Sequence, residues 1–250
     1  MGKLTNKVAV ITGASKGIGA AIARAFAAEG AAVVVNYAAG REGADKVVKE
    51  IVSAGGRATA VGANVANADE VAVLFEKTKA TFGRVDVLVN NAGVYKFAPI
   101  EEFTVDMYRR LFDTNVLGML LCTKAAIPLF PTGGGVIVNV SSIVSTLAPP
   151  ATAVYSGTKG AVDSITKVLA KELGPRNIRV NAVNPGVVIT EGTISAGIAG
   201  SDFEKGAVAD TPLGRVARPE DIALPTIFLA SDDARHITGE TIYISGGSGI

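Results

Sequence analysis

The sequence is poor in several residue types that commonly build functional sites. It has one cysteine, Cys122, one histidine, His236, and no tryptophan among 250 residues. A single cysteine excludes an intrachain disulfide and a cysteine-rich metal cluster, and it fits a reducing compartment. We therefore expect no metal site, and we interpret Cys122 as a small buried apolar residue.

Charge of one sign and long apolar segments are also missing. The 24 basic and 23 acidic side chains give a formal net charge of +1. This balance provides no electrostatic basis for binding nucleic acid or an anionic membrane. No apolar run approaches the ~18 residues of a membrane-spanning helix, and the first residues, MGKLTNKVAV, lack the apolar core of a signal peptide. These features predict a soluble, cytoplasmic protein.

Short β-branched runs, separated by helical patterns, dominate what is present. Seven runs predict strands, at residues 7–12, 31–36, 58–63, 85–90, 135–140, 178–184 and 241–245. Strands that are apolar throughout are buried on both faces. We therefore predict an α/β protein with a three-layer, doubly wound Rossmann fold and a seven-stranded parallel sheet. The length and the 48% hydrophobic content suit a single domain over residues 1–250.

One segment departs from this regular alternation. Residues 191–215 are small, glycine-rich and only weakly periodic where a connection between strands is expected. Such segments beside a ligand site often close over the bound molecule. We predict a substrate lid at about residues 188–215.

A glycine-rich turn, TGASKGIG, follows the first predicted strand and carries glycines at positions 13, 17 and 19. Glycines allow a tight turn and the close approach of a pyrophosphate, which the N-terminus of the next helix then binds. The spacing G-x-x-x-G-x-G differs from the dinucleotide fingerprint G-x-G-x-x-G. A purely structural turn is therefore an alternative.

The same turn also matches a hydrolase motif. GASKG fits the nucleophile elbow G-x-S-x-G, with Ser15 as the nucleophile and His236 downstream. An elbow needs an oxyanion donor from the loop of an earlier strand, and only one strand precedes Ser15. We therefore disfavour a hydrolase and expect His236 in a surface loop.

The end of the second predicted strand bears on the choice of cofactor. NAD sites place an acidic side chain there to bind the ribose 2′-hydroxyl. Here the position holds Asn36 and Tyr37, and Lys16 and Arg41 are nearby in sequence. The lack of a carboxylate and the two cations favour NADP(H) over NAD(H). The alternative is that both cations are solvated surface charges.

Four polar residues are candidates for the chemistry. Tyr155 and Lys159 lie one turn apart on one face of the predicted helix 152–173. A neighbouring ammonium favours the phenolate, so we expect the pKa of Tyr155 to fall below its ordinary ~10. Ser142 ends a strand, where it can donate a hydrogen bond to a substrate oxygen that gains charge. Asn115 interrupts an apolar helical stretch, where a buried amide needs partners.

Together these motifs resemble the short-chain dehydrogenase/reductase family of the classical type over essentially the whole chain. The matching elements, in the family's order and spacing, are TGASKGIG, NNAG (90–93), Asn115, Ser142, YSGTK (155–159) and NPG (184–186). The resemblance implies an NAD(P)-dependent oxidoreductase acting on CH–OH groups. The overall pattern is most similar to 3-oxoacyl-[acyl-carrier-protein] reductases and related carbonyl reductases.

The resemblance also implies residue roles. Tyr155 would be the acid-base residue, while Lys159 lowers its pKa and binds the nicotinamide ribose. Ser142 would orient the carbonyl, and Asn115 would hold a water that connects Lys159 to solvent. The implied cofactor-binding residues are Gly13, Ser15, Lys16, Gly17, Ile18, Gly19, Asn36, Tyr37, Ala38, Asn64, Val65, Asn91, Ala92, Gly93, Tyr155, Lys159, Pro185, Gly186, Val188 and Thr190.

Two departures from the family pattern affect cofactor binding. Asn64 stands where the family commonly has an aspartate that reaches the adenine, and its amide oxygen can still accept that bond. Ala38 and Ala39 lack the hydroxyls that many NADP-using relatives offer to the 2′-phosphate. Backbone N–H groups would have to replace them.

We predict an NADPH-dependent reductase of ketones or 3-oxoacyl-type substrates that also runs in reverse. The expected pocket walls are mostly apolar and favour a neutral or hydrophobic ketone; they are Val94, Tyr95, Ile143, Val144, Leu147, Tyr155, Val187 and the lid segment 191–215. The alternatives are a sugar or polyol dehydrogenase of the same family and a non-catalytic regulator that senses NADP(H).

The resemblance further implies a homotetramer. Segments 104–130 and 152–173 carry apolar or small residues around more of their circumference than one core contact requires. Such helices would pair across a two-fold interface. Simple burial within one chain is the alternative.

Overall fold

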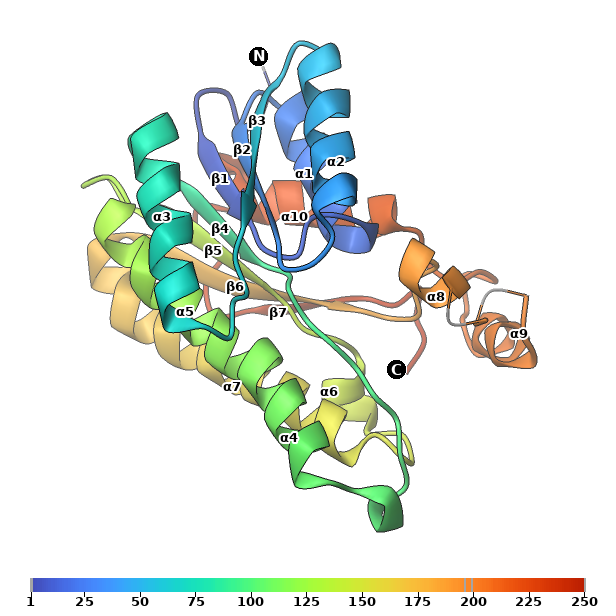
Figure 1. Cartoon of the computed structure of the whole chain (residues 1–250). Helices are drawn as coiled ribbons and strands as arrows, with labels where there is room; N and C mark the ends of the chain where they lie inside the picture. The colour runs from blue at the N-terminus through green and yellow to red at the C-terminus, as the bar shows by residue number, and fades with distance from the viewer. Residues whose placement is uncertain (1, 196, 199, 250) are drawn as a thin grey trace.

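The computed structural model describes residues 2–195, 197–198 and 200–249, and its centre is one parallel sheet. Seven strands lie in the order β3-β2-β1-β4-β5-β6-β7 (Figure 1). Their bounds are β1 Val8–Ile11, β2 Ala32–Tyr37, β3 Arg57–Gly62, β4 Val87–Asn90, β5 Gly135–Val140, β6 Ile178–Pro185 and β7 Thr241–Ile244. The predicted seven-stranded doubly wound sheet is confirmed.

Helices cover both faces of this sheet. One layer consists of α1 (Gly17–Ala28), α2 (Arg41–Ser53) and α10 (Pro219–Ala230). The other consists of α3 (Ala68–Phe82), α5 (Gly118–Ala126) and α7 (Ala153–Leu173), as Figure 1 shows. Shorter helices complete the chain: α4 (Val105–Phe112), α6 (Val144–Leu147), α8 (Glu191–Ser195) and α9 (Asp202–Ala209).

The two helical layers explain why the strands are apolar throughout. Ala9 and Ile11 of β1 pack in the cluster beneath α1, α2 and α10, whereas Val10 packs in the cluster beneath α3, α5 and α7. Val33 and Val34 of β2 divide between the same two clusters. Since successive side chains of a strand point to opposite faces, both sets need apolar residues.

The strand order places a crevice at the carboxyl ends of the sheet. β1 pairs with β2 on one side and with β4 on the other, so the connections after β1 and β4 leave toward opposite layers. Ligands of doubly wound proteins bind at this point. The glycine turn after β1 and the NNAG segment after β4 therefore lie at the same edge.

Two predicted segments differ in detail from the structure. The predicted helix at 104–130 is broken into α4, a π-helical turn at Asp113–Leu117, α5 and a 3₁₀ turn at Ile127–Leu129. Such π turns occur frequently at functional sites. The predicted lid at 188–215 contains α8 and α9, and its residues 196 and 199 lie outside the described residues.

No helix within the described residues has the length and apolar character needed to cross a membrane. In the same part of the chain, no three His, Cys, Asp or Glu side chains gather where they would hold a metal ion.

Candidate active site

A cleft of about 1830 Å³ opens at the carboxyl ends of the strands. We call one part of it the glycine end, which comprises the turn Gly13–Gly19, the start of α2 and residues 63–65. We call the other part the tyrosine end, which comprises Ser142, Tyr155, Lys159 and the segment 93–97. All predicted cofactor-binding residues except Tyr37 line this cleft.

The glycine turn packs against the NNAG segment so closely that side chains would not fit. Gly13 and Gly17 have φ angles of +62° and +58°, a region that favours glycine. A Cβ on Gly13 would lie 2.8 Å from Cα of Ala92, and one on Gly19 would overlap Nδ2 of Asn91. The glycines therefore hold the start of α1 at the edge of the cleft.

The start of α1 binds an anionic oxygen in this structure. The N–H of Gly17 donates a 2.9 Å hydrogen bond to Oε2 of Glu191, which reaches over from α8. The N-cap residue, Lys16, makes no side-chain capping bond, and the first turn of α1 has no acidic residue. An N–H group that donates a hydrogen bond to a carboxylate oxygen can donate equally well to a phosphate oxygen.

Asn36 lines the cleft, and its side chain is fully engaged by hydrogen bonds within the protein. It is 1% exposed. Its Oδ1 accepts from the N–H of Gly13 at 3.2 Å, and its Nδ2 donates to the carbonyls of Ala63 at 3.0 Å and Val61 at 3.2 Å. Asn36 therefore braces the glycine turn against the end of β3.

Tyr37 does not face the cleft. Its ring lies against Gly62, where a Cβ would come within 3.2 Å of the ring. Tyr37 is opposite Gly62 in the register of β2 and β3, and its ring lies over that glycine. Contact between Tyr37 and a cofactor stays a prediction.

Ser15, Lys16 and Arg41 line the glycine end together. Lys16 is exposed, and Arg41 pairs with Asp45 at 3.5 Å on the surface of α2. Both cations are therefore close to the cleft and free to reorient. The carboxylate of Glu42 lines the same region.

The hydrolase alternative fails on topology. Ser15 follows the carboxyl end of β1, whereas His236 is exposed and precedes the amino end of β7. In a parallel sheet these ends lie at opposite edges. Ser15 and His236 therefore cannot form a nucleophile and base pair.

The tyrosine end brings together three of the four predicted reactive residues. Ser142 follows β5 and lies within reach of a side-chain hydrogen bond with Tyr155, which is in the first turn of α7. Nζ of Lys159 lies 5.9 Å from the centre of the Tyr155 ring and donates to the carbonyl of Val140 at 2.8 Å. The end of a strand and the first turns of a helix thus hold the three side chains at one place.

Burial governs the ionisation of these groups. It raises the pKa of Tyr155 to about 12, although the hydrogen bond with Ser142 acts in the opposite direction. Burial also lowers the pKa of Lys159 to about 8, which the charge of Asp163 partly offsets. The expected lowering of the Tyr155 pKa is therefore wrong for this structure, because the loss of solvent around the phenol outweighs its favourable neighbours.

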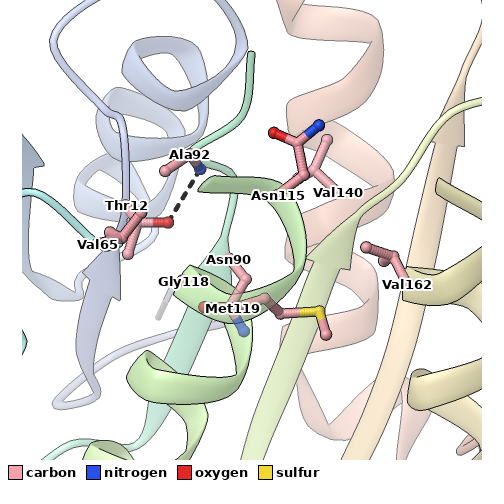
Figure 2. A pocket seen from close by; sticks show the side chains of 9 residues that line it. All are labelled: Thr12, Val65, Asn90, Ala92, Asn115, Gly118, Met119, Val140 and Val162. Carbon is pink, nitrogen blue, oxygen red and sulfur yellow. Dashed lines mark hydrogen bonds between the residues drawn. The ribbon is translucent and has the colours of Figure 1, made fainter. Parts of the chain in front are cut away.

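Asn115 lies in the π-helical turn and clamps two segments together. Its Oδ1 accepts from the N–H of Val94 at 2.8 Å, and its Nδ2 donates to the carbonyl of Val94 at 2.9 Å and to Oγ1 of Thr158 at 3.1 Å. Asn115 does not line the main cleft. It lines a small cavity beside it, with Thr12, Asn90 and Val140 (Figure 2).

This cavity has room for one water molecule. Its volume is about 10 Å³, close to the smallest that holds a water. Oδ1 of Asn90, a buried atom, has no hydrogen-bond partner among the residues that the structure describes. The carbonyl of Val140, the acceptor of Lys159, belongs to another lining residue. The cavity is therefore lined by a residue that also binds the reactive lysine.

A doubly wound sheet with an anion-binding glycine turn and a Ser, Tyr and Lys group in one cleft defines a Rossmann-type oxidoreductase acting on carbonyl or alcohol groups. The model of the family described as "Enoyl-(Acyl carrier protein) reductase" matches residues 13–248. The chain belongs to the short-chain dehydrogenase/reductase family, as its sequence motifs predict.

Relatives resemble the chain over nearly its full length. An uncharacterized oxidoreductase of Methylorubrum extorquens is 61% identical, and the match covers 99% of both chains. A 3-oxoacyl-[acyl-carrier-protein] reductase of Synechocystis sp. is 43% identical over 99% of this chain and 98% of its own. The angucycline C-6 ketoreductase LanV, solved with bound NADP, superposes with a TM-score of 0.93 at 39% identity, covering 99% of this chain and 97% of its own.

Several cleft residues carry no motif and were missed by sequence reasoning. Phe97, Pro149, Pro150 and Phe203 add to the apolar wall of the cleft. The only sequence signal for Phe97 is its spacing of two from Tyr95. Phe203 sits in the weakly periodic segment, where nothing in the sequence indicates which side chains face the cleft.

Proposed function

We propose that the protein is an NADPH-dependent ketoreductase in which Tyr155 donates the proton. The observation that carries this proposal is that Ser142, Tyr155 and Lys159 meet in the same cleft into which the glycine turn directs the start of α1. Bound NADPH would supply the hydride for the carbonyl carbon.

The phenol of Tyr155 suits the role of a general acid. A pKa of about 12 keeps it protonated across the neutral range, so a proton is available whenever a ketone binds. The alkoxide that develops on hydride addition is more basic than a phenolate, which makes proton transfer from Tyr155 favourable. Ser142 is placed to donate a hydrogen bond to the same oxygen.

Lys159 stabilises the phenolate that proton donation leaves behind. Its Nζ is one helical turn from Tyr155 and buried, so its charge acts through little intervening solvent. We propose that the small cavity beside Val140 and Asn115 holds the water that connects Lys159 to a proton source. The size of this cavity and the unpaired Oδ1 of Asn90 support that role.

We propose a preference for NADP(H) over NAD(H). Asn36 and Ala38 offer no carboxylate to repel a 2′-phosphate, and Ser15, Lys16 and Arg41 line the cleft close by. LanV and a short-chain dehydrogenase of Burkholderia cenocepacia were both solved with NADP, the latter at 32% identity and a TM-score of 0.93 over 99% of this chain and all of its own. The nearby carboxylate of Glu42 argues against absolute selectivity.

The substrate side favours a neutral ketone. Apolar side chains from four segments face it: Tyr95, Phe97, Leu147, Pro149, Val187 and Phe203. Such a wall has few partners for the hydroxyls of a sugar or polyol. A ketone or 3-oxoacyl thioester, as the names of the ketoreductase relatives suggest, is the better fit.

We further propose that segment 188–215 of the single domain acts as a lid and that the protein is a homotetramer. α8 and α9 place Thr193, Phe203 and Ala207 against the cleft. Two sets of exposed apolar side chains support assembly: Tyr108, Leu117, Leu120 and Val168 on α4, the π-helical turn, α5 and α7, and Leu224 and Tyr243 on α10 and β7.

Absorbance at 340 nm tests the function directly. Purified protein should oxidise NADPH faster than NADH in the presence of at least one ketone from a panel of ketones, β-ketoesters and sugars. Cofactor binding without turnover on any of them would favour a regulator that senses NADP(H).

A further inference from the structure

Two aromatic side chains stand over the tyrosine end of the cleft. The rings of Tyr95 and Phe97 stack with centroids 5.5 Å apart and planes at 30°. They lie 6.2 Å and 5.9 Å from the ring of Tyr155, each tilted by 60°. The proton donor is thus bordered by a pair of rings from one short segment.

These rings are not part of a closed core. Tyr95 is 46% exposed and Phe97 is 48% exposed, although both line the cleft. Val94, Val154 and Tyr155 pack against the buried cluster of Ala98, Met107 and Leu111, whereas Tyr95 and Phe97 do not belong to that packing among the described residues. The exposed ring surfaces are therefore available to a molecule whose carbonyl oxygen reaches Tyr155.

We propose that Tyr95 and Phe97 form a platform for an aromatic ring, so that the substrates are aryl ketones. This inference rests on the proposed ketoreductase function. In an aryl ketone the ring is bonded to the carbonyl carbon, so a carbonyl oxygen at Tyr155 brings the ring to the platform. The carbonyl carbon receives the hydride of NADPH, the oxygen receives the proton of Tyr155, and NADP⁺ and the alcohol result.

Stacked and tilted rings attract each other beyond the effect of buried area alone, which distinguishes an aryl group from a saturated ring of the same size. Acetophenone and cyclohexyl methyl ketone form such a pair. The diagnostic quantity is the ratio of their kcat/KM values, compared between wild type and Phe97→Leu. This comparison removes the intrinsic difference in reactivity of the two ketones.

Phe97→Leu should lower kcat/KM for acetophenone about 3- to 10-fold more than for cyclohexyl methyl ketone. Phe103→Leu is the matched control. Phe103 is an exposed aromatic residue, and it is not among the described residues that line the cleft. It should leave the ratio unchanged. Equal losses for both ketones in Phe97→Leu would overturn the aryl platform while leaving the ketoreductase function intact.

Binding provides a readout that does not need turnover. Ligand-observed NMR on the NADP⁺-loaded protein gives the Kd of each ketone. Acetophenone should bind more tightly than its saturated counterpart, and Phe97→Leu should remove the difference. If neither these two ketones nor any other compound of the panel is reduced but this binding pattern holds, the function fails and the platform stands; equal Kd values would reject the platform.

A second, independent observation concerns a polar network beneath Ser142. Nδ2 of Asn184, a fully buried residue, lies 3.1 Å from the carbonyl of Ser142, 3.1 Å from Oγ of Ser145 and 3.0 Å from Oδ2 of Asp163. Oγ of Ser145 also donates to the Ser142 carbonyl at 2.9 Å. A carboxylate on α7 thus connects to the backbone of Ser142 through one amide.

We infer that Asp163 is a positioning residue that orients Ser142 through Asn184. A carboxylate is a strong acceptor, so it fixes the direction in which the Asn184 amide donates. Without it, the buried amide loses one of its three acceptors, and its hydrogen bond to the carbonyl of Ser142 is less firmly directed. Asp163 lies one turn beyond Lys159 on α7, away from the glycine end of the cleft.

Asp163→Ala should reduce kcat about tenfold, as expected when a buried hydrogen-bonding partner is lost, while KM for NADPH stays the same. Asp163→Asn keeps an acceptor and should restore most of the rate. Ser164→Ala, at the exposed neighbouring position of α7, is the control.

A kcat within twofold of wild type in Asp163→Ala would overturn the positioning role. So would a parallel rise of KM for NADPH. Should Asp163→Ala not fold, Asn184→Ala removes the same connection and must then show the same selective loss of kcat; a wild-type kcat there would reject the inference.

Discussion

The glycine end and the tyrosine end of the cleft are built on different principles. At the glycine end the working groups belong to the backbone: the N–H of Gly17 binds a carboxylate, and Asn36 and Asn91 hold the turn through main-chain atoms. At the tyrosine end the working groups are side chains; Lys159 is buried and Tyr155 is half-buried, and both have pKa values far from ordinary.

This contrast separates binding from chemistry. At a site made of backbone groups, any added atom that shifts the chain weakens binding. Removing one side chain there lowers the binding affinity only a little. A side-chain site fails when one functional group is lost, even though the fold and the bound cofactor remain. Substitutions at the two ends should therefore change different constants.

The largest effect is expected at the tyrosine end. Tyr155→Phe removes only the hydroxyl and should reduce kcat by roughly 10²- to 10⁴-fold, because the proton donor is lost. Its Kd for NADPH, measured by fluorescence titration, should stay within about threefold of wild type, since a single hydroxyl is at most one hydrogen bond to the cofactor. A kcat near that of wild type would remove Tyr155 from its proposed role.

The next largest effect is expected at the glycine end. Gly13→Ala forces a Cβ to within 2.8 Å of Ala92 at a φ of +62°, so the turn must shift. We expect NADPH to bind about 10- to 100-fold more weakly, because one strained backbone residue raises the free energy of the binding conformation of the turn.

Gly160 offers a matched control for that substitution. It lies within α7, and a Cβ there would have no atom within 4 Å. Gly160→Ala should leave the Kd for NADPH unchanged and raise stability by about 0.5–1 kcal/mol in a thermal melt. Equal losses of affinity in both variants would contradict the special role of the glycine turn.

A pH profile should show the charge of Lys159. Its pKa of about 8 lies below the ordinary value, so the ammonium is present below pH 8 and is lost as the pH rises through that value. The phenolate of Tyr155 is then no longer stabilised. We expect kcat for ketone reduction to fall above pH 8, approaching tenfold per pH unit, in a stopped assay corrected for NADPH stability. A flat profile up to pH 10 would contradict this assignment.

The smallest effect should come from a surface cation at the glycine end. Lys16→Ala should weaken NADPH binding about threefold to fivefold and leave NADH almost unaffected, because an exposed charge is screened by solvent. Isothermal titration with each cofactor gives the two Kd values. Equal weakening of both would place Lys16 away from the 2′-phosphate.

Much of this architecture could be predicted from the sequence because each strand and turn is encoded locally. The apolar runs predict all seven strands, and the motif order predicts the family. The motif residues Gly13, Ser142, Tyr155 and Lys159 also lie in one cleft. The features that the sequence did not reveal, such as the raised pKa of Tyr155, depend on contacts between distant segments.

Two residues illustrate that limit. The pKa of Tyr155 rises because residues far away in sequence exclude water from it, which no spacing along α7 reveals. Asn36 lies near the end of β2, and no sequence pattern reveals that hydrogen bonds with Gly13, Val61 and Ala63 occupy its side chain. The link between Asp163 and Ser142 has the same origin, because strand β6 lies between them.

The central claim is that the glycine end binds the cofactor and the tyrosine end carries out the chemistry. Its most direct test is a rapid-mixing measurement of single-turnover ketone reduction at saturating NADPH, with Gly13→Ala and Tyr155→Phe measured side by side. We predict that Gly13→Ala, once saturated, reduces the ketone at close to the wild-type rate, whereas Tyr155→Phe stays slow at every NADPH concentration. A wild-type single-turnover rate in Tyr155→Phe would contradict the assignment of the proton to this tyrosine.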